Sequence, residues 1–211
     1  MNKYISIFFC VQIIALNLFA MQPKVTPVDY VRPQIDTHKS RWFFFSSASR
    51  PFGMVSLSPD TWTEGSWNSG YLYNSKEIRC FSHVHCWQLA GVPVMPTTGE
   101  VKGHKGMDAY KSTYSHETEI VKPGYHKVEL DTYQIRVELT STSRVGMHRY
   151  TYPAGEKANV LFDVGALLAH GKTEKAAIHR ISSKEIGGYS VLAPTSRRKK
   201  PVTVYFVCLL Y

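Results

Sequence analysis

The chain has 211 residues, of which 44% are hydrophobic and 13% aromatic, so one domain can bury a substantial core. Its formal net charge is +9, but the basic residues are scattered apart from the run at 197–200. We interpret that run as the solvated, aggregation-resistant border of an edge strand. Because no recognised nucleic-acid motif accompanies the charge, we expect no nucleic-acid partner.

Residues 1–20 have the features of a secretory signal peptide. Lys3 supplies the positive start, and residues 5–18 supply an apolar run that is short for a bilayer span. Cleavage after Ala20 predicts a secreted or periplasmic protein. The alternative is an uncleaved membrane anchor, and we expect no other segment to enter a membrane.

The cysteines do not predict a disulfide framework. Cys10 leaves with the signal peptide, which leaves the odd set Cys80, Cys86 and Cys208. On one extended strand Cys80 and Cys86 would lie about 20 Å apart, too far for a disulfide. We expect them to be small buried packing residues.

The first half of the mature chain predicts short strands between loops. Residues 21–33 form an irregular lead-in with three prolines, and residues 41–45 (RWFFF) form an aromatic run that needs to be covered. A short strand is predicted at 54–57. Loops are predicted at 58–65, where Asp60 is interpreted as a turn residue, and at 91–106.

From residue 114 onward the pattern predicts β-structure throughout. Residues 133–139 alternate apolar and polar side chains, which is typical of a strand with one dry face. An all-β fold, an antiparallel β-sandwich or barrel, follows from short strands at this spacing. The predicted strands are 125–130 and 133–139 as a hairpin, 145–152, a doubly covered strand at 159–164, 175–182 and 188–193 as a second hairpin, and 202–207. Residues 208–211 give no turn, cap or polar tail, which suggests a truncated chain.

Residues 66–91 (SWNSGYLYNSKEIRCFSHVHCWQLAG) combine aromatic, histidine and amide side chains with few aliphatic ones. That composition is typical of a surface that holds a polar ligand with flat apolar faces, such as a sugar. Read as a strand, residues 80–87 place Phe81, His83, His85 and Trp87 on one face. Cys80, Ser82, Val84 and Cys86 take the other face.

Four residues of this stretch are candidates for sugar binding. Trp67 and Trp87 are either stacking platforms or ordinary core tryptophans. His83 and His85 either donate hydrogen bonds to sugar hydroxyls or are buried histidines that tie two loops together. The cysteines lie on the opposite strand face, so no Cys–His cluster converges on a zinc ion, and we expect no metal site.

Three segments resemble glycoside hydrolase family 92. They are RWFFFSSASRPFGMVSLSPD (41–60), GSWNSGYLYNSKEIRCFSHVHCWQLAGVPVMPTTGE (65–100) and VKPGYHKVELDTYQIRVELTSTSRVGMHRYTYP (121–153). The resemblance implies a secreted, calcium-dependent, exo-acting α-mannosidase that inverts the anomeric centre. It covers the family's amino-terminal domain, a galactose-mutarotase-like super-sandwich, at residues 21–207. We expect this sandwich to be incomplete at its C-terminal end.

The family's general acid, general base and calcium ligands belong to an (α/α) helical barrel that we expect to lie outside this chain. Inversion needs two carboxyl groups about 6.5–9.5 Å apart, and Asp60, Glu64, Glu77 and Asp163 (a predicted strand-end cap) form no evident pair. The resemblance therefore implies no catalytic residue and no cofactor here. Ca²⁺ is expected only in the full-length enzyme.

By the same resemblance, the chain supplies mannose-subsite residues to the helical domain. The residues are Trp67, His83, His85 and Trp87, and the partners are mannose-containing glycans and the helical catalytic domain. The sequence departs from the family pattern at 36–42 and 87–91. The alternatives are a stand-alone lectin-like binding module and a non-functional gene fragment.

Overall fold

The computed structural model describes residues 25–38, 48–63, 70–84, 91–166, 172–196 and 198–211. The chain divides into two compact units, residues 1–31 and 32–211. In the first unit, the short helix η1 (Pro27–Tyr30) begins after Thr26, whose backbone N–H donates to the Asp29 carboxylate at 2.7 Å. Within the described ranges, no helix has the length and apolar character needed to cross a membrane.

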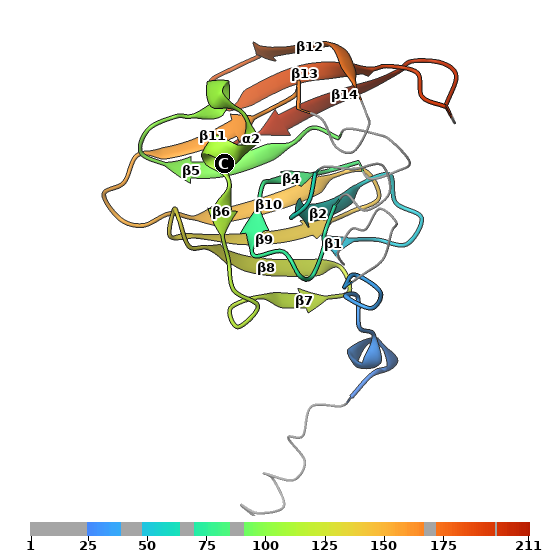
Figure 1. The fold of residues 1–211 in the computed structure, drawn as a ribbon, viewed down its shortest axis with the longest axis vertical. Coiled ribbons are helices and arrows are strands. Elements are labelled where there is room, and N and C mark those ends of the chain that lie inside the picture. Colours follow the sequence, from blue (N-terminus) through green and yellow to red (C-terminus); the bar gives the residue numbers. More distant parts are fainter. Residues whose placement is uncertain (1–24, 39–47, 64–69, 85–90, 167–171, 197) are drawn as a thin grey trace, which may run out of the picture. The chain divides into compact units, whose positions relative to one another are not determined.

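The second unit consists mainly of antiparallel strands, so the all-β prediction is confirmed (Figure 1). Its sheets have the orders β1-β2-β4-β5-β11, β10-β9-β8-β7, β12-β13-β14 and β3-β6. The elements are β1 (Ala48–Ser49), β2 (Ser56–Asp60), β3 (Glu77–Ile78), β4 (Cys80–Ser82), β5 (Val94–Thr98), η2 (Gly103–Lys105), α2 (Met107–Tyr110), β6 (Ser112–Thr113), β7 (Ile120–Lys122), β8 (Tyr125–Leu130), β9 (Ile135–Ser141), β10 (Gly146–Thr151), β11 (Ala158–Phe162), β12 (Thr173–Arg180), β13 (Glu185–Leu192) and β14 (Val202–Leu209).

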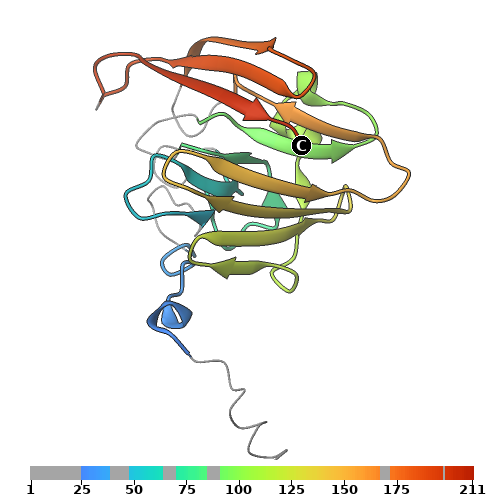
Figure 2. The same ribbon diagram turned by 180° about the vertical axis from the view of Figure 1, so that it is seen from behind.

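The hairpin of β8 and β9 lies at the centre of the four-stranded sheet, as the alternation of its residues predicts (Figure 2). Val128 pairs with Val137, and Leu130 pairs with Ile135. These four side chains are fully buried, whereas the residues between them are half-buried or exposed. One face of the hairpin therefore belongs to the core, and the other face is partly exposed to solvent.

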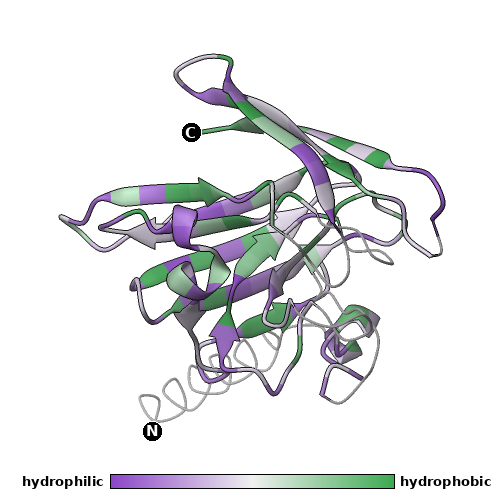
Figure 3. Cartoon of the chain, turned by 45° about the horizontal axis from the view of Figure 1, so that its top comes forward, coloured by the Kyte–Doolittle hydropathy of each residue, from purple (hydrophilic) through white to green (hydrophobic). Residues whose placement is uncertain are grey.

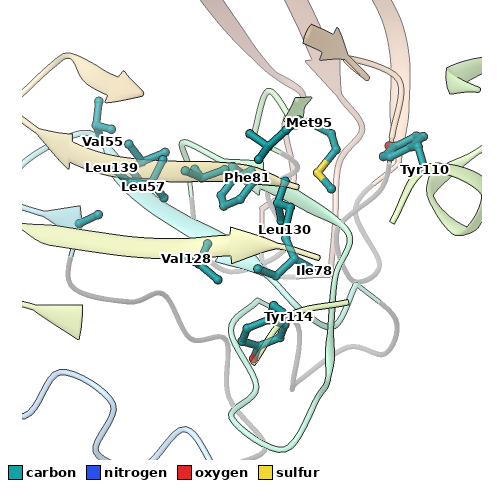
Figure 4. Close-up of a cluster of buried hydrophobic side chains, with 13 residues drawn as sticks. Val55, Leu57, Ile78, Phe81, Met95, Tyr110, Tyr114, Val128, Leu130 and Leu139 are labelled. Carbon is teal, nitrogen blue, oxygen red and sulfur yellow. The ribbon is translucent and has the colours of Figure 1, made fainter. Parts of the chain in front are cut away.

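The core lies between the five-stranded and the four-stranded sheets, with β1 and β2 packed on β9. This arrangement is the predicted β-sandwich. Leu57 and Phe81 enter the core from one sheet, and Leu139 enters it from the other (Figure 4). The full cluster is Ala48, Val55, Leu57, Ile78, Phe81, Met95, Tyr110, Tyr114, Val128, Leu130, Ile135, Val137 and Leu139.

Two prolines lie inside strands, so the loops predicted around them were wrong. Pro59 pairs with Phe81 across β2 and β4, and Pro96 pairs with Val160 across β5 and β11. A proline has no N–H to donate and is tolerated where no neighbour requires that donor. β4 meets β5 at a single register pair, Phe81 with Val94, so Pro96 lies beyond the stretch where β4 is paired.

Asp60 is not a turn residue, as the sequence had suggested. It is the last residue of β2, is fully buried, and accepts a hydrogen bond from the Cys80 thiol at 3.4 Å. Burial, and then the neighbouring Asp60, raise the pKa of that thiol well above its ordinary value. Cys80 is thus a protonated packing residue.

Several strand limits also differ from the predictions. β4 ends at Ser82 rather than continuing to residue 87 as one regular strand, and β11 is half-buried rather than covered on both sides. In the second predicted hairpin, β12 begins and ends two residues earlier than predicted and β13 is longer than predicted, and β14 includes Cys208 and Leu209. β14 exposes Tyr205, 77% accessible, with Val207 and Leu209 on the same side, in the sheet where Figure 3 shows hydrophobic and hydrophilic bands.

Candidate functional site

Of the four candidate sugar-binding residues, His83 lies within the described part of the chain. Trp67 lies in the range 64–69, and His85 and Trp87 lie in the range 85–90, outside the described residues. The aromatic run at 41–45 and Cys86 and Glu64 are also outside them. Among the four candidates, the described residues therefore define the surroundings of His83.

The backbone of His83 joins two separate segments at the end of β4. Its N–H donates to the Gly91 carbonyl at 2.9 Å, and its carbonyl accepts from the Ser56 N–H at 2.9 Å. Gly91 packs so closely on Val84 that an added Cβ would lie 2.4 Å from the Val84 oxygen. Only glycine fits at this position, which explains why residues 84 and 91 can lie in contact.

The ring of His83 is held on both of its nitrogens. Nδ1 lies 2.9 Å from the Val92 carbonyl oxygen, and Nε2 lies 2.8 Å from Nε2 of His148 in β10. A Cβ on Gly146, also in β10, would lie 2.9 Å from the His83 ring carbon Cδ2. The ring therefore fills the space that the absent Gly146 side chain leaves.

His148 has two aromatic partners besides His83. Its Nδ1 lies 2.7 Å from the Tyr150 hydroxyl, and Phe81 packs edge-on against its ring with centroids 6.4 Å apart. Burial, and then the facing His83, hold the pKa of His148 well below its ordinary value. Phe81 and His83 both meet His148, so they share a face, as the predicted alternation requires.

Val92 has an unusual backbone conformation for its residue type. Its φ is 45°, in the left-handed region, and its side chain is buried. A β-branched residue in this region is strained by about 1–3 kcal/mol and persists only where its surroundings hold it. The hydrogen bond from the His83 ring to the Val92 carbonyl is one of the contacts that hold it.

A second polar cluster surrounds Glu119, whose side chain is only 2% exposed. Both of its oxygens lie within 2.9 Å of the Tyr71 hydroxyl, and the Gln34 amide donates to Oε2 at 3.1 Å. His116 Nδ1 lies 2.6 Å from Oε2 and His126 Nε2 lies 2.9 Å from Oε1.

The environment of Glu119 favours its charged form. Burial by itself raises the pKa of this carboxyl, but His126 and the hydrogen bonds from His116 and Tyr71 outweigh burial and hold the pKa below its ordinary value. His116 Nε2 also lies 2.7 Å from the Tyr73 carbonyl, so both nitrogens of that ring face acceptors. The ring stacks on Tyr73 with centroids 4.0 Å apart.

Two of the carboxylates considered from sequence, Glu77 and Asp163, have partners within the protein. Glu77 forms an ion pair with Lys111 at 2.9 Å, and Asp163, directly after β11, accepts a hydrogen bond from the Tyr110 hydroxyl at 2.7 Å. Sequence reasoning did not single out Glu119, His148 or Tyr150. His148 and Tyr150 occupy core-facing positions of the alternating segment 146–151, and an imidazole at such a position was the available signal.

The described residues also bear on metal binding. In the ranges that the structure describes, no three His, Cys, Asp or Glu side chains gather where a metal ion would fit. Calcium takes six to eight oxygen ligands. The described residues do not fit such a site.

Comparison with known proteins places this sandwich in a family. Residues 30–210 match the N-terminal domain of glycosyl hydrolase family 92. The chain belongs to this family. A comparison with curated proteins found no match.

Solved structures of family 92 have the same fold. An α-mannosidase from Bacteroides thetaiotaomicron, solved with mannoimidazole and also without it, is 32% identical with a TM-score of 0.75, over 85% of this chain. An inverting mannosidase from the same organism, 20% identical over 89% of this chain with a TM-score of 0.66, shares the fold. This chain spans 24% of the length of the mannoimidazole-bound relative and 29% of the inverting mannosidase.

Proposed function

We propose that this chain is the carbohydrate-contacting N-terminal domain of a secreted α-mannosidase and contributes mannose-subsite residues. The observation that supports this most strongly is its 32% identity to a family 92 α-mannosidase solved with mannoimidazole, over 85% of the chain. Under this proposal Trp67, His83, His85 and Trp87 belong to the subsite. Secretion rests on the signal-peptide features of residues 1–20.

The proposal assigns the chemistry of hydrolysis to a separate helical domain. Inverting hydrolysis needs a general acid and a general base on either side of the bond. Glu119, a carboxylate whose side chain is only 2% exposed, is surrounded by donors from Gln34, Tyr71 and His116, which leaves its oxygens committed within the protein. The acid, the base and the Ca²⁺ ligands are therefore proposed to come from the helical domain.

His83 has a defined place in this proposal. Because both ring nitrogens face protein atoms, its contribution is to hold the segment ends at 84 and 91 together rather than to present a free nitrogen to a sugar hydroxyl. Trp67, His85 and Trp87 are then the proposed direct contacts. Tryptophan with a few polar neighbours is the usual platform for a sugar face.

Titration calorimetry with mannose and α-linked mannobiose tests the proposal. The 211-residue chain should bind mannosides, and Trp67→Ala or Trp87→Ala should abolish the heat. Tyr205→Ala is the matched control, since it removes an exposed aromatic side chain from β14 and should leave binding unchanged. Equal loss in the Tyr205 variant would contradict the assignment.

Two further outcomes separate the alternatives. Mannoside binding that does not change when a family 92 helical domain is added would indicate a stand-alone lectin-like module. A chain that gives no cooperative thermal transition would indicate a non-functional gene fragment. Hydrolysis of 4-nitrophenyl α-mannoside by this chain alone, with or without Ca²⁺, would overturn the assignment of chemistry to another domain.

A further inference from the structure

The contact between His83 and His148 constrains where the protons of both rings lie. Two ring nitrogens 2.8 Å apart form a hydrogen bond only if one carries hydrogen and the other is bare. Hydrogen positions follow from the partners of the remaining nitrogens. Those partners are the Val92 carbonyl oxygen on the His83 side and the Tyr150 hydroxyl on the His148 side.

The Val92 carbonyl fixes the direction of the whole chain of hydrogen bonds. A carbonyl oxygen only accepts, so Nδ1 of His83 donates to it at 2.9 Å. In a neutral ring, Nε2 of His83 is then bare and accepts from Nε2–H of His148. Nδ1 of His148 is in turn bare and accepts from the Tyr150 hydroxyl at 2.7 Å.

We propose that His148 is a positioning residue: its Nε2–H donates to the bare Nε2 of the His83 Nδ1–H tautomer, keeps the His83 ring against the Val92 carbonyl and so helps to hold Val92 in its left-handed conformation. The donors run in one direction, from the Tyr150 hydroxyl through His148 and His83 to the Val92 carbonyl. The reverse direction is impossible because the last group has no hydrogen to donate. This series of hydrogen bonds links β10 of the four-stranded sheet to the segment that follows β4 of the five-stranded sheet.

Two observations support uncharged forms of His148 and Tyr150 in this series of hydrogen bonds. Burial, and then the facing His83, hold the pKa of His148 well below its ordinary value, so this ring is uncharged near neutral pH. Among the described residues, His83 and Tyr150 are the titratable groups that face it directly, and Tyr152 and Cys208 are those that lie next to Tyr150. Burial raises the pKa of Tyr150 well above its ordinary value, so its hydroxyl retains its hydrogen.

This inference rests on the proposed function only for the place of His83 near the mannose subsite. The ring and the backbone of His83 hold two consecutive residues, since the ring donates to Val92 and the backbone N–H donates to Gly91. A change of tautomer would release the first of these bonds. The strained Val92 backbone would then lose one of the contacts that hold it.

Long-range ¹H–¹⁵N correlation NMR of the ¹⁵N-histidine-labelled chain at pH 7.5 tests the tautomers directly. One ring should show the Nδ1–H pattern and should disappear in His83→Gln. The ring that disappears in His148→Gln should show the Nε2–H pattern. A doubly protonated His83, or His83 as the Nε2–H tautomer, would overturn the proposal.

Matched variants test whether His148 acts through His83. His148→Gln places an amide donor opposite His83 and should keep the Nδ1–H signal of His83 protected from exchange with solvent, whereas His148→Leu removes the donor and should lose this protection. Tyr150→Phe leaves both the Val92 carbonyl and the His148 ring in place, so His83 should keep its Nδ1–H pattern. Tyr152→Phe is the control, since its hydroxyl donates to the Asn159 carbonyl and its loss should leave His83 unchanged.

Mannoside binding supplies a separate readout. His148→Leu should weaken binding by about fivefold, which corresponds to the net contribution of one neutral hydrogen bond, and Tyr152→Phe should not weaken it. If the unmodified chain binds no mannoside while the tautomers are as expected, the proposed function fails and the positioning role stands. Equal effects of His148→Leu and Tyr152→Phe on His83 would refute the positioning role.

Discussion

Replacing Glu119 by glutamine tests the buried polar cluster most directly. The substitution keeps the side-chain shape but removes the charge that faces His116 and His126 and places an amide nitrogen against donors such as Tyr71. A hydrogen bond to a charged group contributes about 1.5–3 kcal/mol. Because His116 is about one-third exposed, solvent screens its share. We therefore expect a loss of about 3 kcal/mol in the free energy of unfolding.

Urea unfolding at pH 7, followed by circular dichroism, measures this loss. Glu129→Gln is the matched control, because Glu129 pairs with the half-exposed Arg136 at the surface and should cost less than about 1 kcal/mol. A Glu119→Gln protein within about 1 kcal/mol of the unmodified chain would refute the reasoning.

Glu119→Gln and Glu129→Gln also test how the free energy of unfolding changes with pH. The folded-state pKa of Glu119 lies below its unfolded value, so its contribution is present above about pH 4.3 and is lost as the pH falls through the folded-state pKa. Glu119→Gln should flatten this acid limb of the stability profile. Glu129→Gln should leave the limb in place.

Three further predictions concern the surroundings of His83. Gly146→Ala should lower the free energy of unfolding by about 1–3 kcal/mol in urea melts, because the new methyl group meets the His83 ring at 2.9 Å. Gly91→Ala should cost more than Gly146→Ala, because its Cβ meets rigid Val84 backbone at 2.4 Å; equal costs would contradict the close approach. The folded-state pKa of His148 is depressed, so stability should be complete above about pH 6.5 and fall as the pH drops below it. His148→Gln should remove that slope between pH 6.5 and 5, and an unchanged slope would show that another group causes it.

The sequence predicted best where the signal is local. The hairpin of β8 and β9 follows from apolar and polar residues alternating with period two, and the same alternation fixes which side chains are buried. The sequence failed at Pro59 and Pro96, which are strand residues because of where neighbouring strands end. Proline preference is a local rule, whereas the need for a donor depends on the neighbouring strand.

The amino-acid sequence by itself determined the all-β class, the main hairpins and membership of family 92, because strand periodicity and motif order are written in consecutive residues. The tertiary structure alone decided that His83 meets His148, 65 residues away, and that Glu119 gathers donors from Gln34 to His126. These contacts depend on how separate strands pack against each other. Packing brings distant polar groups together only when each finds a partner in the interior.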